Sequence, residues 1–552
     1  PAGSGRPPNS RDADTSAHFH FCCDVMVTGG GVAGLQAANT AAASGAKVLL
    51  VEQSAHWGGR APVDGGTVDG VPVENYVDQI VAELETMPNV TLRKRLMGAG
   101  VYDHGYVLGY EQLRDHAPDE PSPRHRLWRI RAGHIVTATG AIERPLPFAG
   151  NDVPGVMLAS AMRDYVVNYG VSVGDRTVIV TNNDDAYLTA CALKYAGLNG
   201  PVILDARVLA EDSPAMEQAK ALGIRVMMGH AVAKVKGGKR VTGVGICSQA
   251  GEGAVLEEIA CDAVAMSGGW SPVVHLWSHC GGKLVWDESQ AHFRPDVDKA
   301  PQGADGTAFV TAAGAANGAL RLADALGDGD QAGKLAAAAA GYKVRQAKCP
   351  VGDSPEEAPM MPVWLMPQGA GVALRSKAWL DYQNDVKVSD VQLAAQEGFE
   401  SVEHAKRYTT LGMATDQGKL SNINGLATLA GALNSTIPQV GTTTFRPPYT
   451  PISMGAIAGE ARGDVFQPMR RTPMHDWHEA HGADWEPVGH WRRPYAYLRD
   501  GENTHDAVMR ETRNARENMG LLDASTLGKL IVKGPDAGKF LDMLYTNMMS
   551  TL

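Results

Sequence analysis

The stretch that decides the fold is Asp24 to Gln53, which reads DVMVTGGGVAGLQAANTAAASGAKVLLVEQ. It opens with the apolar run Val25 to Val27, which is typical of a short buried strand. A glycine-rich turn follows, and the small residues from Leu35 to Ala43 predict a helix that ends before a further glycine. A second strand is predicted from Lys47 to Val51, and the whole stretch therefore predicts a Rossmann-like nucleotide-binding unit.

The glycines of the turn have the spacing G-x-G-x-x-G, and each has its own role. Gly29 allows a sharp turn, Gly31 lets the backbone approach a pyrophosphate, and Gly34 lets the helix lie close to the strand. Free N–H groups and the positive end of the helix dipole then face the phosphates. Glu52 follows the second strand, where an acid accepts hydrogen bonds from an adenosine ribose and repels a 2′-phosphate, so NAD or FAD is favoured over NADP.

Such a fingerprint alone is a weak signal, because glycines also cluster in ordinary turns before core helices. Here the strand, the helix, the second strand and the acid occur in the expected order, which favours a nucleotide site. The segment HWGGR places Gly58 and Gly59 in a second loop near the nucleotide, before a helix predicted from Asn75 to Thr86. The following APVDGGTVDG lacks the cysteine pair of disulfide reductases, which argues against that chemistry.

Length and composition bound the class of protein. The 552 residues exceed what one hydrophobic core usually supports, and a net charge of -11 argues against nucleic acid or an anionic membrane as a partner. The seven cysteines are scattered without a C-x-x-C pair, as in a cytoplasmic protein without a cysteine metal site. The alanine run Ala336 to Ala340 is too short to span a membrane. Because the chain starts at Pro1 and ends at Leu552 inside what reads as a domain, we expect a segment of a longer subunit.

A second strand–turn–helix–strand unit is predicted from Arg176 to Arg207. The segment HIVTATG at His134 to Gly140 resembles a turn of the flavoprotein superfamily with two dinucleotide domains. Members of this superfamily have a glycine turn for NAD(P)H in their second unit. Here the turn from Thr181 to Asp185 reads TNNDD, so side chains would block the backbone and two carboxylates would meet the phosphates. We expect the fold to be retained and the site to be lost.

The segment Gly306 to Leu320 resembles the last FAD-contacting motif of the same superfamily. Its flavin-binding members have an aspartate after the glycine, whereas here Gly314 is followed by Ala315. The ADP half of the first site is intact and the flavin half is weakened, which favours NAD. The residues predicted to hold NAD are Gly29, Gly31, Ala33, Gly34, Glu52, Gln53, Gly59, Arg60, Thr139, Gly140 and Gly314.

A small helical unit follows a Pro- and Met-rich linker. Its helices are predicted at Ser389 to Glu397, Ser401 to Arg407 and Asn422 to Leu433. The segments Tyr382 to Val386, Ser401 to Lys419 (SVEHAKRYTTLGMATDQGK) and Thr442 to Gly459 (TTTFRPPYTPISMGAIAG) resemble the alpha subunits of heterotetrameric sarcosine oxidase, and the resemblance runs the full length. Related dehydrogenase subunits hold a [2Fe-2S] cluster here, which this cysteine-free segment excludes.

The resemblance implies cofactors and partners. It places FMN at the interface with a beta subunit, bordered by a cluster of cations and hydroxyls that suits a phosphate: Lys406, Arg407, Thr409, Thr410, Gln417 and Lys419. It places FAD and the substrate on the beta subunit, so the catalytic residues of this chain are unknown, and it allows zinc on a small partner among the gamma and delta subunits. The end of the chain, His475 to Leu552, resembles the start of the aminomethyltransferase fold that binds tetrahydrofolate.

The predicted fold class is α/β: two Rossmann-like units as in disulfide-reductase-like flavoproteins, a small helical domain and the start of an aminomethyltransferase-like α+β domain. The predicted boundaries are 1–21 for an N-terminal lead-in, 22–174 with 262–347 for the NAD domain, 175–261 for the second Rossmann-like domain, 348–380 for a linker, 381–465 for the small domain and 466–552 for the folate domain.

The predicted function is a subunit of an oxidase that demethylates sarcosine to glycine with O2, giving H2O2 and formaldehyde or 5,10-methylenetetrahydrofolate. Two alternatives stay open at this point. One is a subunit of an opine, hydroxyproline or glycine dehydrogenase. The other is a non-oxidative folate-dependent methyltransferase whose nucleotide domain is structural.

Overall fold

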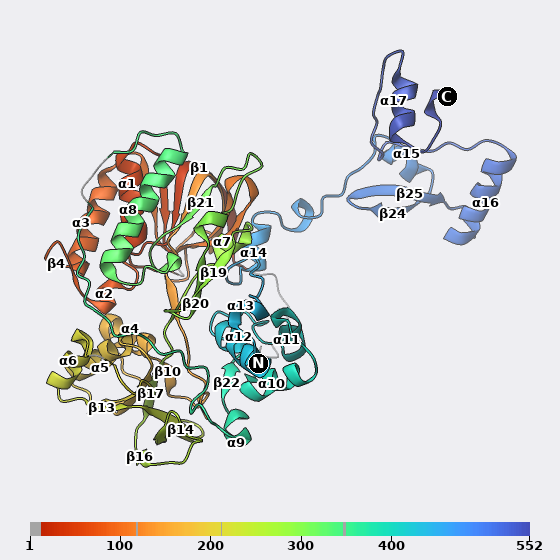
Figure 1. The fold of residues 1–552 in the computed structure, drawn as a ribbon. Coiled ribbons are helices and arrows are strands. Elements are labelled where there is room, and N and C mark those ends of the chain that lie inside the picture. Colours follow the sequence, from red (N-terminus) through yellow and green to blue (C-terminus); the bar gives the residue numbers. More distant parts are fainter. Residues whose placement is uncertain (1–12, 118–119, 211, 346–348, 552) are drawn as a thin grey trace. The chain divides into compact units, whose positions relative to one another are not determined.

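The computed structural model describes residues 13–117, 120–210, 212–345 and 349–551. The chain divides into two compact units, which we call unit 1 (Pro1–Gly459) and unit 2 (Glu460–Leu552). Unit 1 contains a large mixed sheet, a parallel sheet and a small helical domain, and unit 2 contains a β-hairpin with short helices (Figure 1). In these described ranges no helix is both long and apolar enough to cross a membrane.

The first sheet of unit 1 has seven strands in the order β5-β2-β1-β8-β7-β6, with β21 also paired to β8. Strands β5, β2, β1, β8 and β21 run parallel, while β6, β7 and β8 form an antiparallel meander. The residues of the predicted run Val25 to Val27 are all fully buried in this sheet. The strands are β1 Ser16–Thr28, β2 Val48–Val51, β5 Val90–Arg93, β6 Leu96–Tyr102, β7 Tyr106–Gln112, β8 His125–Thr137 and β21 Val310–Ala312.

Strand β1 begins at Ser16, well before the predicted run. The interpretation of residues 1–21 as a lead-in is therefore wrong from Ser16 onward, and residues 1–12 lie outside the described part. The residues from Ser16 pair with β8, and the rings of Phe19 and Phe21 lie 4.5 and 5.8 Å from the ring of Trp128. This partner strand lies far along the chain, so the segment alone does not show what it pairs with.

Three helices cover one face of this sheet: α1 Val32–Ala43, α3 Val73–Thr86 and α8 Leu322–Ala339 (Figure 1). Helices α1 and α8 touch through glycines. A Cβ atom on Gly329 would overlap the Ala33 carbonyl oxygen, and one on Gly333 would lie 2.5 Å from the Ala37 carbonyl oxygen. The opposite face of the sheet packs against α7 His275–His279.

The second sheet has five parallel strands in the order β10-β17-β11-β12-β13, flanked by helices and a small antiparallel sheet. Strands β10 and β17 belong to this sheet but lie outside the predicted boundaries 175–261, which are therefore wrong. The sheet is complete only with one strand that precedes this range and one that follows it. The elements are β10 Val156–Leu158, α4 Ala159–Tyr169, β11 Thr177–Thr181, α5 Asp185–Tyr195, β12 Val202–Asp205, α6 Pro214–Ala221, β13 Arg225–Met228, β14 His230–Gly237, β15 Val241–Ser248, β16 Glu257–Ile259 and β17 Ala263–Ser267.

Short elements join the two sheets and build the small domain. In the small domain, helices form close to the predicted ranges and bury one apolar cluster. The joining elements are α2 Ala61–Asp64, β3 Thr67–Val68, β4 Val71–Pro72, η1 Asp103–Gly105, β9 Ala141–Glu143, β18 Trp270–Pro272, β19 Leu284–Asp287, β20 His292–Pro295, η2 Val297–Lys299 and η3 Gly314–Asn317. The small domain has α9 Val372–Arg375, β22 Trp379–Asp381, β23 Val386–Lys387, α10 Val388–Gln396, α11 Val402–Thr409, α12 Asn422–Ala432, α13 Ile437–Val440 and α14 Met454–Ala458. Residue 348 of the predicted linker lies outside the described residues.

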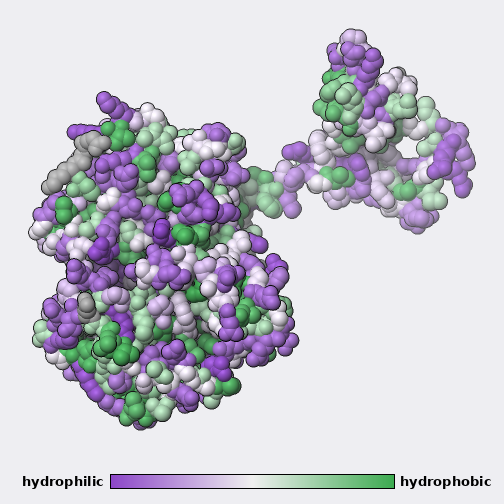
Figure 2. Space-filling view, viewed as in Figure 1, coloured by the Kyte–Doolittle hydropathy of each residue, from purple (hydrophilic) through white to green (hydrophobic). Residues whose placement is uncertain are grey.

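Unit 2 is held by polar contacts more than by a large core. The His478 ring lies between Asp523 (2.8 Å to Oδ2) and the Tyr497 hydroxyl (2.6 Å). Several large apolar side chains stay exposed, among them Leu521, Leu530 and Phe540. Hydrophobic residues are accordingly visible on the surface of this unit (Figure 2). Its elements are η4 Gly463–Val465, α15 His475–Ala480, β24 Ala483–Val488, β25 Trp491–Tyr497, α16 Thr504–Glu517, α17 Ala537–Leu544 and η5 Met549–Thr551.

The glycine contact between α1 and α8 predicts opposite outcomes for one substitution at two positions of α8. Gly333→Ala should lower the free energy of unfolding by about 1–3 kcal/mol, because its Cβ would press on backbone that cannot yield cheaply. Gly327→Ala, which meets nothing within 4 Å, should raise it by up to about 1 kcal/mol through helix propensity. Urea unfolding of both variants measures the difference. Equal effects would show that the contact does not constrain the fold.

Candidate functional site

The glycine turn between β1 and α1 contains two kinds of glycine. Gly29 has a φ of +107°, and a Cβ there would overlap the Ala138 carbonyl oxygen, while a Cβ on Gly34 would overlap the Gly29 carbonyl oxygen. Both are required by packing. Gly31 has an ordinary extended backbone, and the nearest atom to its Cβ position is the Gly59 Cα at 3.9 Å. The fold alone does not require glycine there, so the open space fits a group that approaches the N-terminus of α1.

Glu52 is 8% exposed and stabilises this turn through two hydrogen bonds. Its Oε2 accepts a hydrogen bond from the Gly30 N–H at 2.8 Å, and its Oε1 accepts one from the Ser54 N–H at 2.7 Å. A carboxylate has about four acceptor positions, so two remain for ribose hydroxyls. The neighbouring Gln53 is exposed. Glu52 therefore positions the loop and can also meet a ribose.

The second predicted loop lies against the first. The Gly58 N–H donates to the Gly30 carbonyl at 2.8 Å, and a Cβ on Gly59, whose φ is +58°, would lie 3.0 Å from the Gly31 Cα. Arg60 turns toward Asp64, with its Nη2 2.6 Å from Oδ1. A surface pocket of about 310 Å³ opens beside the same loop, between it and α3, and is lined by Ala55, His56, Trp57, Val77, Asp78, Val81, Ala82, Glu85 and Lys94.

The remaining predicted residues also gather around α1. Gly314 lies so close to Ala33 that a Cβ on it would be 2.5 Å from the Ala33 Cβ. The Thr139 hydroxyl donates to the Val273 carbonyl at 2.7 Å, and Gly140, with a φ of +75°, has open space at its Cβ position. The structure thus brings the predicted glycines of four segments together at the N-terminus of α1.

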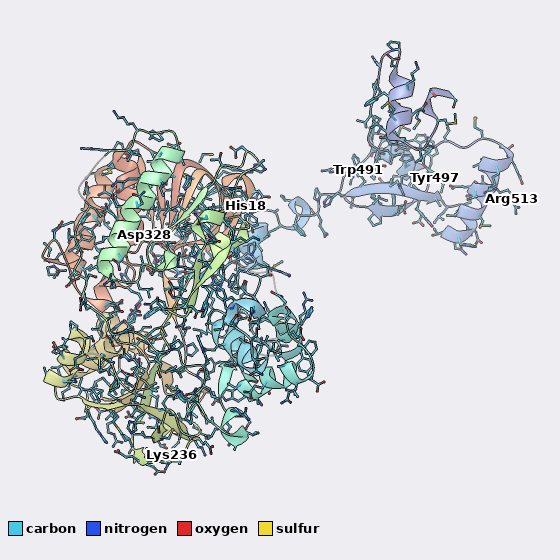
Figure 3. The ribbon with its side chains drawn as sticks, viewed as in Figure 1. His18, Lys236, Asp328, Trp491, Tyr497 and Arg513 are labelled. Atoms are coloured by element: carbon cyan, nitrogen blue, oxygen red, sulfur yellow. The ribbon has the colours of Figure 1, made fainter. Side chains whose placement is uncertain are left out.

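Asp328 is a site residue that the sequence interpretation missed. It lies on α8 (Figure 3), and its Oδ2 accepts hydrogen bonds from the Gly314 N–H at 2.8 Å and from Asn317 Nδ2 at 3.1 Å. Burial raises the pKa of Asp328, and these two hydrogen bonds oppose the shift. Ala315 has no side chain that could replace the aspartate of flavin-binding relatives, and Asp328 uses its charge to hold the η3 turn instead. No sequence pattern marks this role, because Asp328 and Gly314 meet only through the packing of α8.

In the second Rossmann-like domain, the predicted turn is filled by other residues of the chain. Asn182 is fully buried, and its Nδ2 donates to the Met361 carbonyl at 2.7 Å, while the Met361 N–H donates back to the Asn182 carbonyl. Asp184 accepts a hydrogen bond from the Ala358 N–H at 2.7 Å. The segment from Ala358 to Met361, within the predicted linker, therefore lies on the turn where a second dinucleotide would bind.

Both carboxylates of that turn are paired with buried arginines. Arg207 Nη2 lies 2.7 Å from Asp184 and 2.7 Å from Asp205, and Arg163 Nη2 lies 2.8 Å from Asp185. The expected repulsion of a phosphate by free carboxylates is thus replaced by a steric obstacle: their charges are compensated and the space is occupied.

The residues predicted to border FMN do not converge on one point. Lys406 and the exposed Arg407 lie on α11, and the hydroxyls of Thr409 and Thr410 donate to carbonyls of their own helix end. Gln417 Nε2 donates to the Pro448 carbonyl at 2.6 Å. Lys419 points inward, with its Nζ 2.6 Å from the Tyr449 carbonyl. Hydrogen bonds within the chain therefore already occupy four of these six side chains.

Three family models match the chain: pyridine nucleotide-disulphide oxidoreductase over residues 23–297, sarcosine oxidase A3 domain over residues 375–460, and GCVT N-terminal domain over residues 474–552. Over 99% of its length the chain is 41% identical to the sarcosine oxidase subunit alpha of Corynebacterium sp. (strain P-1), and 41% identical to that of Rhizobium meliloti (strain 1021). The chain is thus similar to sarcosine oxidase alpha subunits over nearly its whole length. It spans about half the length of these family members, 56% and 53%.

This similarity confirms the resemblance to sarcosine oxidase alpha subunits predicted from the sequence. The α/β fold class is confirmed as well, since the oxidoreductase model covers both sheets except β21 and the start of β1, and the GCVT model covers unit 2 from residue 474. Among solved structures, L-proline dehydrogenase from P. horikoshii has a TM-score of 0.59 at 20% identity and covers 80% of each chain, a likeness of fold alone.

Removal of the buried Arg207 from the second Rossmann-like domain is predicted to cause a large loss of stability. Arg207→Met leaves Asp184 and Asp205 buried without their cation, and should lower the free energy of unfolding by about 3–5 kcal/mol. Arg225→Met removes an equally short but exposed pair with Glu257 and should have little effect. Denaturant unfolding of the two variants tests this. Similar losses in both would mean that the network around the turn is not what holds the linker.

Proposed function

We propose that this chain is the alpha subunit of an oxidase that demethylates sarcosine to glycine with O2 and releases H2O2. The one-carbon unit leaves as formaldehyde or as 5,10-methylenetetrahydrofolate. The observation that carries the proposal is the 41% identity to sarcosine oxidase alpha subunits over nearly the whole chain. The enzyme works in the cytoplasm with beta, gamma and delta subunits, zinc being allowed on a small one.

Within this assembly the chain binds NAD. The open Cβ position at Gly31 supports a pyrophosphate at the N-terminus of α1, and the free lone pairs of Glu52 support a ribose without a 2′-phosphate. Ala315 gives no carboxylate for a ribityl chain. When bound, NAD supplies a nicotinamide that can accept a hydride. The chain's own residues provide binding: Gly31 and Gly59 leave room, Glu52 orients the ribose, and Asp328 keeps the Gly314 turn in place.

The domains divide the remaining tasks. The small domain borders FMN at the beta-subunit interface through residues between Lys406 and Lys419, FAD and sarcosine sit on the beta subunit, and unit 2 contributes the start of a tetrahydrofolate-binding domain. No catalytic residue is assigned to this chain. The GCVT match supports the folate acceptor. The dehydrogenase and the non-oxidative methyltransferase remain alternatives, and purified complex without flavin absorbance would favour the latter.

The NAD proposal predicts which nucleotide the chain releases on heating. Chromatography should show NAD, and FAD in its place would contradict the proposal. Gly31→Val should abolish retention, because the side chain would fill the space of the pyrophosphate. The melting temperature of the nucleotide-free chain should change little, since only the Gly59 Cα lies within 4 Å of the new Cβ. That comparison separates loss of the site from loss of the fold.

The proposed reaction predicts that folate traps the carbon without its escape to solvent. A folate acceptor held in the same particle raises its effective concentration at the imine or formaldehyde. Turnover of the purified complex with sarcosine and tetrahydrofolate should yield methylene-folate even with a formaldehyde scavenger in solution. If methylene-folate forms only without the scavenger, the carbon leaves the particle. If sarcosine drives no oxygen uptake at all, the oxidase proposal itself is wrong.

A further inference from the structure

A cluster of charged residues joins the two sheets of unit 1, where α2 and α4 lie side by side (Figure 1). Asp64 ends α2, which follows the glycine loop of the first sheet, and Glu143 ends β9. Arg163 on α4 and Asp185 on α5 belong to helices that flank the second sheet. Arg163 Nη2 reaches both sides, because it lies 2.8 Å from Asp64 Oδ1 and 2.8 Å from Asp185 Oδ1. We call these four residues the Glu143 cluster.

Glu143 differs from the two aspartates because no cation is paired with it. It is 2% exposed, and its Oε2 accepts a hydrogen bond from the Ser160 N–H at 2.8 Å. Its Oε1 has no hydrogen-bond partner among the described residues, and neither has Asp185 Oδ2. Arg163 pairs with Asp64 and Asp185, whereas Glu143 forms no ion pair within the described ranges. A carboxyl group that is buried without a cation keeps its proton more readily than a solvated one.

The surroundings of Glu143 disfavour its ionised form. Burial raises the pKa of Glu143 to about 7, and the nearby charge of Asp185 adds to the rise, while hydrogen bonds from Ser160 and Ser267 oppose it. Burial and then the charge of Asp185 also raise the pKa of Glu357, which reaches the same place from the linker. Glu143 therefore titrates near neutral pH, in a setting that already contains negative charge.

The cations around the cluster are too few to compensate three ionised carboxyl groups. Arg60 Nη2 lies 2.6 Å from Asp64 Oδ1, on the side of the first sheet. Burial raises the pKa of Asp64, but Arg163 and Arg60 both lower it, so Asp64 is not the group that holds a proton. Arg144, next to Glu143 along the chain, donates to backbone carbonyls instead. Three carboxyl groups thus share two arginines, and one proton makes the group neutral.

From this arrangement we infer that Glu143 carries a proton when the two sheets are docked, and that loss of this proton to solvent loosens the contact between α2 and α4. The protonated group has an O–H to donate, and Asp185 Oδ2 is a nearby acceptor without another partner. An ionised Glu143 would instead repel Asp185 and attract Arg163, whose Nε also has no partner. Arg163 would then hold Asp64 less tightly. This pH-sensitive joint is independent of the proposed oxidase function.

The direction of the pH dependence follows from the raised pKa. Glu143 titrates near its ordinary value of 4.5 when it is solvated and near 7 when it is docked. Between these values the docked state holds a proton that the undocked state has released, so docking weakens as the pH rises. From pH 5 to pH 8 the contribution of Glu143 to the docking equilibrium should fall on the order of a hundredfold.

Hydrogen exchange of the full 552-residue chain tests the joint, with mass spectrometry of the peptides that contain α2 and α4 and with correction for the intrinsic exchange rate at each pH. The wild-type chain should lose protection in both peptides between pH 5 and pH 8. Glu143→Gln has nearly the same shape but no titratable group, so it should keep its protection. Glu257→Gln is the matched control and should follow the wild type, because Glu257 lies on the surface in a pair with Arg225.

Three results would overturn the joint: wild-type protection that stays constant from pH 5 to pH 8, the same pH dependence in Glu143→Gln as in the wild type, or a loss that spreads equally to α1 and α8. The last result would report general unfolding of the first sheet. If Glu143→Gln does not fold, Asp185→Asn serves as the second variant. It removes the charge that opposes ionisation of Glu143 and should flatten the pH dependence between pH 6 and pH 8. An unchanged dependence in that variant would equally contradict the joint.

Discussion

The close approach of α1 to the backbone of β1 and β8 is the contact on which unit 1 depends. The helix can enter only because Gly34 leaves room for the Gly29 carbonyl, and the turn can pass Ala138 only because Gly29 lacks a side chain. Once α1 is seated there, α8 packs on it through Gly329 and Gly333. Helix α8 in turn presents Asp328 to the Gly314 N–H, so the same absence of side chains builds the core and leaves the space of the proposed nucleotide site.

The second Rossmann-like domain repeats the strand–turn–helix arrangement, but its turn carries polar side chains in place of glycines. Asn182 and Asp184 occupy the turn where glycines would leave space, and buried polar side chains must find partners in the protein. They find them in Arg207 and in the linker backbone at Ala358 and Met361. The linker segment from Ala358 to Met361 thereby becomes part of the packing of the second Rossmann-like domain.

The chain's contribution to the proposed oxidase is binding and organisation. Its glycine site, its small domain and unit 2 each match a family model of different character, and the match to alpha subunits covers about half of those relatives.

The sequence by itself determined the local elements and the glycine fingerprint, because turns, helix ends and the acid at Glu52 are encoded by neighbouring residues. It also predicted the loss of the second fingerprint at Asn182. It did not predict that β1 starts at Ser16, that the second sheet recruits β10 and β17, or that Asp328 holds Gly314. These features join residues far apart along the chain, and only the tertiary structure decides which distant backbone and side-chain groups meet.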